Sequence, residues 1–270
     1  MAGSILLVSN PPHGAVDARR AAPPLGLTPA EATLKVHYPV PEIWLAFDGR
    51  AEAEKVAAEL VAAGLHVTVV GAEELGSVPP RTEIRSFAIH DVGLVLLADH
   101  RTTLGRAEPL IAVFCAPREA GGGEVRPPGG RTSDVMRAVG DHGAVQDTRG
   151  FLDLYLTQQG QLRRLAIVQG VTDFSGFGEA ALPSPAGNLI KFVGEIESHF
   201  PNAKVDRRLA LLQARRRTGA TGVQARAGAS RKGLTYGTAE LKQLLGHISP
   251  ELHDVSEYEL SSRLAYLTRR

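Results

Sequence analysis

Cysteine is almost missing from this chain. Cys115 is the single cysteine, which excludes a disulfide framework within the chain and a cysteine-rich zinc site. It stands in the apolar run AVFC, where a free cysteine is ordinarily a small buried hydrophobic residue. A structural thiol is therefore the expectation, and a reactive thiol the alternative.

Long apolar runs are missing as well. No stretch approaches the length of a membrane-spanning helix. The apolar run from Ile5 to Val8 is too short for a signal peptide, and no basic leader precedes it. A soluble cytoplasmic protein without a transmembrane segment is the expectation.

A strong net charge and a catalytic motif are also missing. The formal net charge is +1, so the chain as a whole is neither acidic nor a binder of polyanions. The nine histidines show no metal-ligand spacing. Ser175 in DFSGFG lacks the glycine that a nucleophile elbow has before its serine. The sequence therefore predicts no catalytic residue, no cofactor and no metal, and favours a protein that is not an enzyme.

β-Strand patterns dominate the middle of the chain. The densest signal runs from Ile84 to Phe114, where β-branched and large apolar residues alternate with Asp and Gly turns. Two further strands, at 151–157 and LRRLAIVQ, are joined by a turn at Gln158 to Gly160. Ser184 and Pro185 then start an amphipathic helix that ends near His199. Residues 81–200 thus give about seven short strands followed by one helix.

This order resembles a barrel of the pleckstrin-homology type, in which a C-terminal helix closes two bent antiparallel sheets. The resemblance is one of topology, without a sequence fingerprint. The alternative is an unrelated antiparallel sheet with one covering helix.

The first part of the chain alternates strands and helices. The pattern predicts the order strand, helix, helix, strand, helix, strand as far as Val70. Thr28, Pro29 and Glu31 form the capping box of the second helix. Residues 25–70, with LGLTPAEA, AEAEKVAAELVAAG and the closing strand, resemble the C-terminal domain of the bacterial ribosomal stalk protein. That family recruits translation factors through basic positions on paired helices. The resemblance implies a small α/β module that holds a partner.

A basic stretch separates the β-rich region from the C-terminus. Nine lysine and arginine residues between Lys204 and Lys232 accompany a single acid, Asp206. A solvated linker is one interpretation. Contact with phosphate, on nucleic acid or on an anionic surface, is the other.

The last helix begins with a capping box of Ser256 and Glu259. Its leucine stripe must bury itself in this chain or in another, since a lone helix of this length is marginal in water. With the basic stretch, this stripe completes the predicted partner-binding residues: Arg207, Arg208, Arg215, Arg216, Arg217, Arg231, Lys232, Leu260, Leu264 and Leu267.

Together these patterns predict an α+β protein. A small α/β domain in βααβαβ order occupies residues 1–76. An antiparallel β-barrel or sheet domain with a covering helix occupies 81–203 and contains a mobile insertion at 118–150. A basic linker follows at 204–237, and a C-terminal helical segment at 238–270.

The predicted function is that of a non-enzymatic cytoplasmic binding or adaptor protein, with a protein partner expected. The alternatives are a nucleic-acid- or anionic-surface-associated protein that uses residues 204–232, and a hydrolase with a site between its domains.

Overall fold

The computed structural model describes residues 5–10, 15–36, 40–116, 149–210 and 255–270. The predicted insertion lies almost entirely outside the described residues, as do most of the basic linker and the first part of the C-terminal segment. Among the predicted partner-binding residues, the same holds for Arg215, Arg216, Arg217, Arg231 and Lys232.

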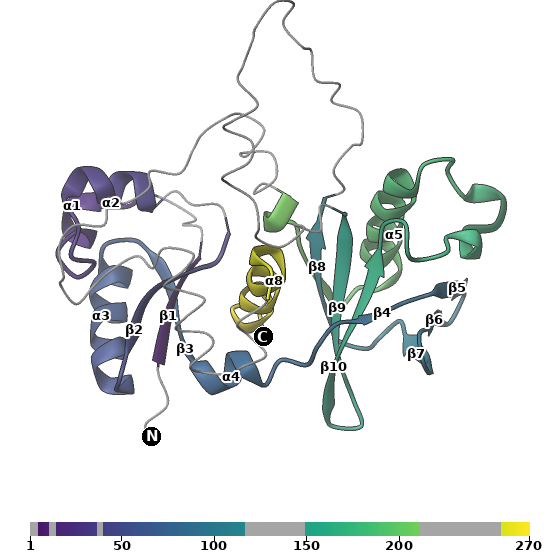
Figure 1. The fold of residues 1–270 in the computed structure, drawn as a ribbon, viewed down its shortest axis with the longest axis horizontal. Coiled ribbons are helices and arrows are strands. Elements are labelled where there is room, and N and C mark those ends of the chain that lie inside the picture. Colours follow the sequence, from purple (N-terminus) through teal and green to yellow (C-terminus); the bar gives the residue numbers. More distant parts are fainter. Residues whose placement is uncertain (1–4, 11–14, 37–39, 117–148, 211–254) are drawn as a thin grey trace, which may run out of the picture.

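The described residues form separate helices and mainly antiparallel sheets, which confirms the α+β class (Figure 1). The elements in chain order are β1 (Ile5–Asn10), α1 (Ala18–Ala21), α2 (Pro29–Lys35), β2 (Glu42–Phe47), α3 (Arg50–Ala62), β3 (His66–Gly71), α4 (Ala72–Gly76), β4 (Thr82–Glu83), β5 (Ser86–His90), β6 (Gly93–Leu97), β7 (Arg101–Gly105), β8 (Leu110–Cys115), β9 (Phe151–Gln158), β10 (Gln161–Val168), the 3-10 helix η1 (Ser175–Ala180), α5 (Pro185–His199), β11 (Ala203–Asp206) and α8 (Glu257–Leu267).

The first part of the chain has the predicted βααβαβ order. β1 lies in the middle of a three-stranded sheet and pairs antiparallel with β2 and β3. The capping box of α2 is present, because Thr28 N donates to Glu31 Oε2 at 2.8 Å and Glu31 N donates to Thr28 Oγ1 at 3.3 Å. The resemblance to the ribosomal stalk domain itself stays a prediction.

Two sheets follow. One has five strands in the order β11-β8-β9-β10-β4, and the other has three in the order β5-β6-β7. β11 pairs parallel with β8, and β4 pairs parallel with β10. These sheets remain open within the described residues, so of the two predicted forms the sheet is found and the barrel is not. The pleckstrin-homology resemblance stays a prediction.

The five-stranded sheet is covered on both faces. Along β9, Leu152 and Leu154 face one core, with α5 and the three-stranded sheet, whereas Phe151 and Tyr155 face another, with α8. The alternation follows from the two-residue period of a strand. Asp153 falls on the α8 side of β9, in a row of otherwise apolar positions.

Large apolar side chains of the strands and helices fill the cores. Buried examples are Trp44, Leu60, Phe87, Leu96, Phe114, Leu154, Leu165 and Phe192. Val56 and Val67 are partly buried and pack against the core that contains Trp44 and Leu60.

Helix α8 lies between the β1–β3 sheet and the five-stranded sheet (Figure 1). Its residues Leu260, Leu264 and Leu267 are buried in one core with Leu6 of β1 and Tyr155 of β9. The leucine stripe is therefore buried in this chain rather than left for another. Among the described helices, none is long and apolar enough to span a membrane.

Candidate functional site

Asp153 is the centre of a buried network of charged side chains. Its own side chain has no exposed surface. Arg81, just before β4, donates from Nε to Oδ1 at 2.8 Å and from Nη2 to Oδ2 at 3.0 Å. Arg164 of β10 donates from Nε and Nη2 to Oδ2, at 3.2 and 2.7 Å. Two guanidinium groups thus hold one carboxylate, and the contact with Arg81 is bidentate.

Helix α8 completes the coordination of Asp153. The Ser262 hydroxyl donates to Asp153 Oδ2 at 2.6 Å. The Tyr155 hydroxyl lies 2.8 Å from Ser262 Oγ. Because the single proton of Ser262 points to the carboxylate, Tyr155 is the donor in this second bond. Two hydrogen bonds therefore connect Tyr155 of β9 to Ser262 of α8 and Ser262 to Asp153 of β9.

The charges of the network fix its protonation. Burial alone would raise the pKa of Asp153, but the positive charges of Arg81 and Arg164 outweigh it and lower the pKa to about 2. Burial, together with the Asp153 carboxylate, raises the pKa of the Tyr155 hydroxyl. Asp153 is thus ionised and Tyr155 neutral near pH 7, as their hydrogen bonds require.

Glu259 of α8 extends the network toward solvent. Arg164 Nη1 donates to its Oε1 at 3.0 Å, and Arg263 Nη2 donates to the same oxygen at 2.9 Å. Burial opposes ionisation of Glu259, but Arg164 and Arg263 keep its pKa below the ordinary value.

Only half of the predicted capping box of α8 is present. Glu259 N donates to Ser256 Oγ at 3.2 Å, as predicted. The Glu259 carboxylate binds the two arginines.

These groups position α8. They come from β9, β10, the segment before β4, and the C-terminal helix, so a movement of α8 or Arg81 would break hydrogen bonds to Asp153 inside the fold. The sequence analysis did not predict this network. The sequence does contain a sign of it, because Asp153 and Arg164 each interrupt an apolar run in the two strands of one predicted hairpin. In the observed register Asp153 pairs with Ala166, which places Arg164 two residues along on the same face.

A second charged site surrounds Asp206 at the end of β11. Arg208 donates from its backbone N to Oδ1 at 3.0 Å, and from its side-chain Nε to Oδ1 and Oδ2 at 2.9 and 2.8 Å. Arg269, after α8, donates from Nε to Oδ2 at 3.3 Å. Burial acts against ionisation of Asp206, but the bonds and charge of Arg208 lower its pKa.

Further cations lie in β11 or shortly after β11 and α8. Lys204 Nζ donates to the Arg269 carbonyl at 3.4 Å. Arg207 pairs with Glu197 of α5 at 2.8 Å, and Arg270 pairs with Glu74 of α4. We call this group the basic cluster; its members are Lys204, Arg207, Arg208, Arg269 and Arg270.

The structure brings together only part of the predicted partner-binding set. Arg207 and Arg208 belong to the basic cluster, whereas the three leucines are core residues of this chain. Arg269 and Arg270 were missed, because their nearness to β11 depends on the return of α8 along the five-stranded sheet. Sequence alone does not show that return.

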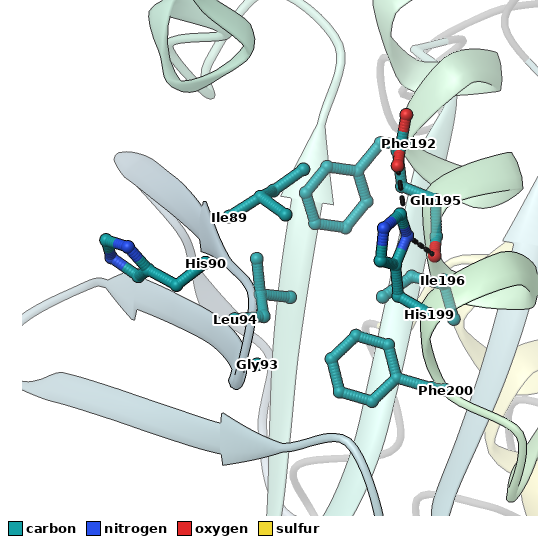
Figure 2. Close-up of a pocket in the computed structure, with 9 residues that line it drawn as sticks. All are labelled: Ile89, His90, Gly93, Leu94, Phe192, Glu195, Ile196, His199 and Phe200. Atoms are coloured by element: carbon teal, nitrogen blue, oxygen red, sulfur yellow. Dashed lines mark hydrogen bonds and ion pairs between the residues drawn. The ribbon is translucent and has the colours of Figure 1, made fainter.

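A small cavity lies between the β5–β6 hairpin and α5 (Figure 2). Its lining is mainly apolar, and its volume of about 10 Å³ admits roughly one water molecule. His199 Nδ1 lies 3.1 Å from Glu195 Oε2, and Figure 2 shows His90 directed away from the cavity. An organic substrate does not fit in a space of this size.

Neither a metal site nor a reactive serine stands out in the part of the chain that the structure describes. There, no group of His, Cys, Asp and Glu side chains is arranged to hold a metal ion. Ser175 Oγ donates to Asp173 Oδ2 at 2.8 Å, a contact within one turn.

Comparison of the chain with protein-family models, curated proteins and solved structures gives no match.

Proposed function

We propose that this chain is a non-enzymatic binding or adaptor protein that holds an acidic protein partner at the basic cluster. The observation that carries the proposal is the meeting of cations from two distant parts of the chain, since Arg269 binds Asp206 of β11 and Lys204 Nζ donates to the Arg269 carbonyl. Lys204 and Arg207 belong to β11 and its end, and Arg269 and Arg270 follow α8. Among the described residues, the five cations of the cluster are accompanied by three carboxylates, Asp206, Glu197 and Glu74.

The position of the cluster supports recognition of a partner. Arg207, Arg269 and Arg270 keep 47%, 43% and 52% of their side chains exposed. Asp206 holds Arg269, Glu197 pairs with Arg207 and Glu74 pairs with Arg270, so a carboxylate orients each of these arginines while part of its side chain stays available to a partner. Cations at the end of α8 are also favourable for the helix, whose carbonyl end is negative. β11 lies at one edge of its sheet, so the site is at a border of the fold.

A charge-matched pair of variants tests the proposal. The first replaces Arg207, Arg269 and Arg270 by Gln. The second replaces Arg85, Arg101 and Arg106 by Gln; these arginines are exposed on and around the β5–β7 sheet. Both variants change the net charge equally, so they differ only in where the charge is removed.

Retention on immobilised poly-L-glutamate, followed over a salt series, is the measurement. We expect the wild type and the β5–β7 variant to be retained at low salt, and the basic-cluster variant to elute earlier. Equal elution of all three proteins would contradict the assignment of the site. Failure of the wild type to bind at any salt would contradict the proposal as a whole.

Nucleic acid is the second candidate, favoured by the sequence that continues from the cluster. Arg215, Arg216, Arg217, Arg226, Arg231 and Lys232 follow Arg208 in the chain. The same salt series on duplex DNA, on RNA and on anionic vesicles separates the candidates. For DNA, removal of one arginine that binds a phosphate should reduce the slope of log affinity against log salt by about one unit.

The cytoplasmic location is part of the same proposal. An acidic protein partner and the nucleic acids are both present in that compartment. The basic cluster also contains no group that could act as a nucleophile with a base beside it.

A further inference from the structure

β11 is the outermost strand of the five-stranded sheet, and in the part of the chain that the structure describes only one of its two edges is paired. That edge pairs parallel with β8 from Ala203 to Asp206. In such a ladder, alternate residues direct their N–H and C=O groups to opposite edges, so part of the backbone polar groups of β11 point away from β8. An edge with unpaired groups is a template for one further strand.

The basic cluster lies on both faces of the sheet beside this strand. On the face that α8 covers, Lys204 Nζ donates to the Arg269 carbonyl at 3.4 Å, and Arg269 Nε donates to Asp206 Oδ2 at 3.3 Å. On the opposite face, the guanidinium carbon of Arg207 lies 5.7 Å from the centre of the Phe114 ring, which belongs to the core with α5. Lys204 is exposed, and so is nearly half of the Arg207 side chain. A strand added to β11 would therefore meet cations on both of its faces.

We propose that the acidic partner of the basic cluster binds through an extended segment that adds to β11 as a further strand. This mode of binding presupposes the proposed function and specifies the conformation of the partner. Backbone hydrogen bonds to β11 supply part of the affinity, and successive side chains of the added strand point to opposite faces. Carboxylates at neighbouring positions are therefore needed, so that one meets Lys204 and Arg269 and the next meets Arg207.

The charge of the cluster selects an acidic segment over a second copy of this chain. Pairing of two β11 strands would bring two basic clusters together, and like charges across a strand pair are destabilising. Lysine on an edge strand, here Lys204, opposes such self-pairing in natural sheets. An acidic segment replaces that repulsion with attraction.

Two heptapeptides of identical composition, acetylated and amidated at their ends, test the pattern of side chains. As a strand, Thr-Glu-Glu-Thr-Glu-Glu-Thr presents its carboxylates to both faces, whereas Glu-Thr-Glu-Thr-Glu-Thr-Glu presents all of them to one face. We expect the first peptide to bind the wild type more tightly in isothermal titration at low salt. Equal or tighter binding of the alternating peptide would contradict recognition from both faces.

N-Methylation of the first peptide separates strand addition from attraction between charges, because every methylated form keeps its carboxylates. Methylation of alternate residues leaves the donors of one peptide edge free to bind β11, so the affinity should stay close to that of the unmodified peptide. Methylation of every residue removes all backbone donors, and the affinity should fall about tenfold or more through the lost hydrogen bonds.

The outcomes distinguish the mode of binding from the function itself. Equal affinities of the three forms would overturn strand addition and leave an acidic partner at the basic cluster. Retention of the protein on poly-L-glutamate without binding of any heptapeptide would likewise overturn strand addition. Loss of both kinds of binding would contradict the proposed function as well.

Hydrogen exchange of the wild type locates the peptide on the chain. The bound peptide should slow exchange in β11 and leave β7, an edge strand of the three-stranded sheet, unchanged. The basic-cluster variant should lose this protection, whereas the β5–β7 variant should keep it. Protection confined to a segment other than β11 would overturn the site.

Discussion

Asp153 and Asp206 are both almost fully buried, and arginines hold both of them. They differ in what lies around those arginines. Arg164, beside Asp153, has no exposed side-chain surface, whereas Arg269, beside Asp206, keeps 43%. Ser262 of α8 also binds Asp153, which closes that network inside the fold.

The difference separates a structural site from the site that we propose for recognition. In the interior, each cation and each carboxylate depends on protein partners, because removal of one leaves the other charged and unsolvated. At the surface, water replaces a missing partner, and the free edges of the arginines can meet another molecule. The Asp153 network thus fixes α8 in place, and the basic cluster is the site that we propose for a partner.

Asp153→Ala should have the largest effect. It leaves Arg81 and Arg164 without their shared acid, and breaking a buried pair costs about 3–5 kcal/mol. Urea unfolding measures the loss. Asp99→Ala serves as the control, since Asp99 and Arg85 form an exposed pair, and it should change stability by less than about 0.5 kcal/mol. Similar losses in both variants would mean that the Asp153 network does not support the fold.

Acid should weaken the interior site in a defined pH range. The pKa of Asp153 is about 2 in the fold, against an ordinary value of 3.8. Because the pKa of Asp153 is lower in the folded state than in the unfolded state, its ionised form stabilises the fold at pH values above about 4. This stabilisation is lost as the pH falls from about 4 to about 2. The contribution is about 2 kcal/mol.

Asp153→Asn provides the comparison for the acid range. The gap in unfolding free energy between wild type and variant should shrink by about 2 kcal/mol across those pH values. A gap that stays constant would show that ionisation of Asp153 does not stabilise the protein.

Asp206→Asn should cost less than the change at Asp153. Its amide still offers one oxygen to Arg208, and Arg269 can turn toward water. We expect a loss of about 1.5–3 kcal/mol, the range for a hydrogen bond to a charged group. Chemical unfolding under the conditions used for Asp153→Ala gives a direct ranking. If Asp206→Asn proves the more damaging, the division between interior and surface sites is wrong.

Arg207→Gln should have the smallest effect on stability. The Arg207–Glu197 pair is exposed on both sides, and such pairs contribute about 0–1 kcal/mol. The melting temperature should therefore barely move, while retention on poly-L-glutamate should fall. A variant that loses stability but not retention would reverse the roles assigned to the two sites.

The local elements follow from the sequence for local reasons. The turn between β9 and β10 places Gln159 and Gly160 at φ of 51° and 76°, the backbone of a tight hairpin turn. The strands on either side were predicted from their own side chains. Ser184 accepts a hydrogen bond from Gly187 N at 3.3 Å and starts α5 where expected. Such signals act over a few residues, so they can be read from a short stretch of sequence.

The candidate sites depend on contacts between distant parts of the chain. Arg81 lies 72 residues from Asp153, and Ser262 lies 109 residues from it. The period of each strand tells which side chains share a face, but not which helix covers that face. The leucine stripe of α8 likewise predicts burial without telling where.

The sequence by itself determined the order of the first strands and helices, the start of α2 and α5, the turn between β9 and β10 and the need to bury the last helix, because period and capping are properties of neighbouring residues. It did not show the short strands β4 and β11, which form by pairing with distant strands. The tertiary structure decided that α8 lies between two sheets. That placement alone brings Ser262 to Asp153 and Arg269 to Asp206. Buried charges need partners from all sides, and those partners come from segments whose positions only the packing of the whole chain determines.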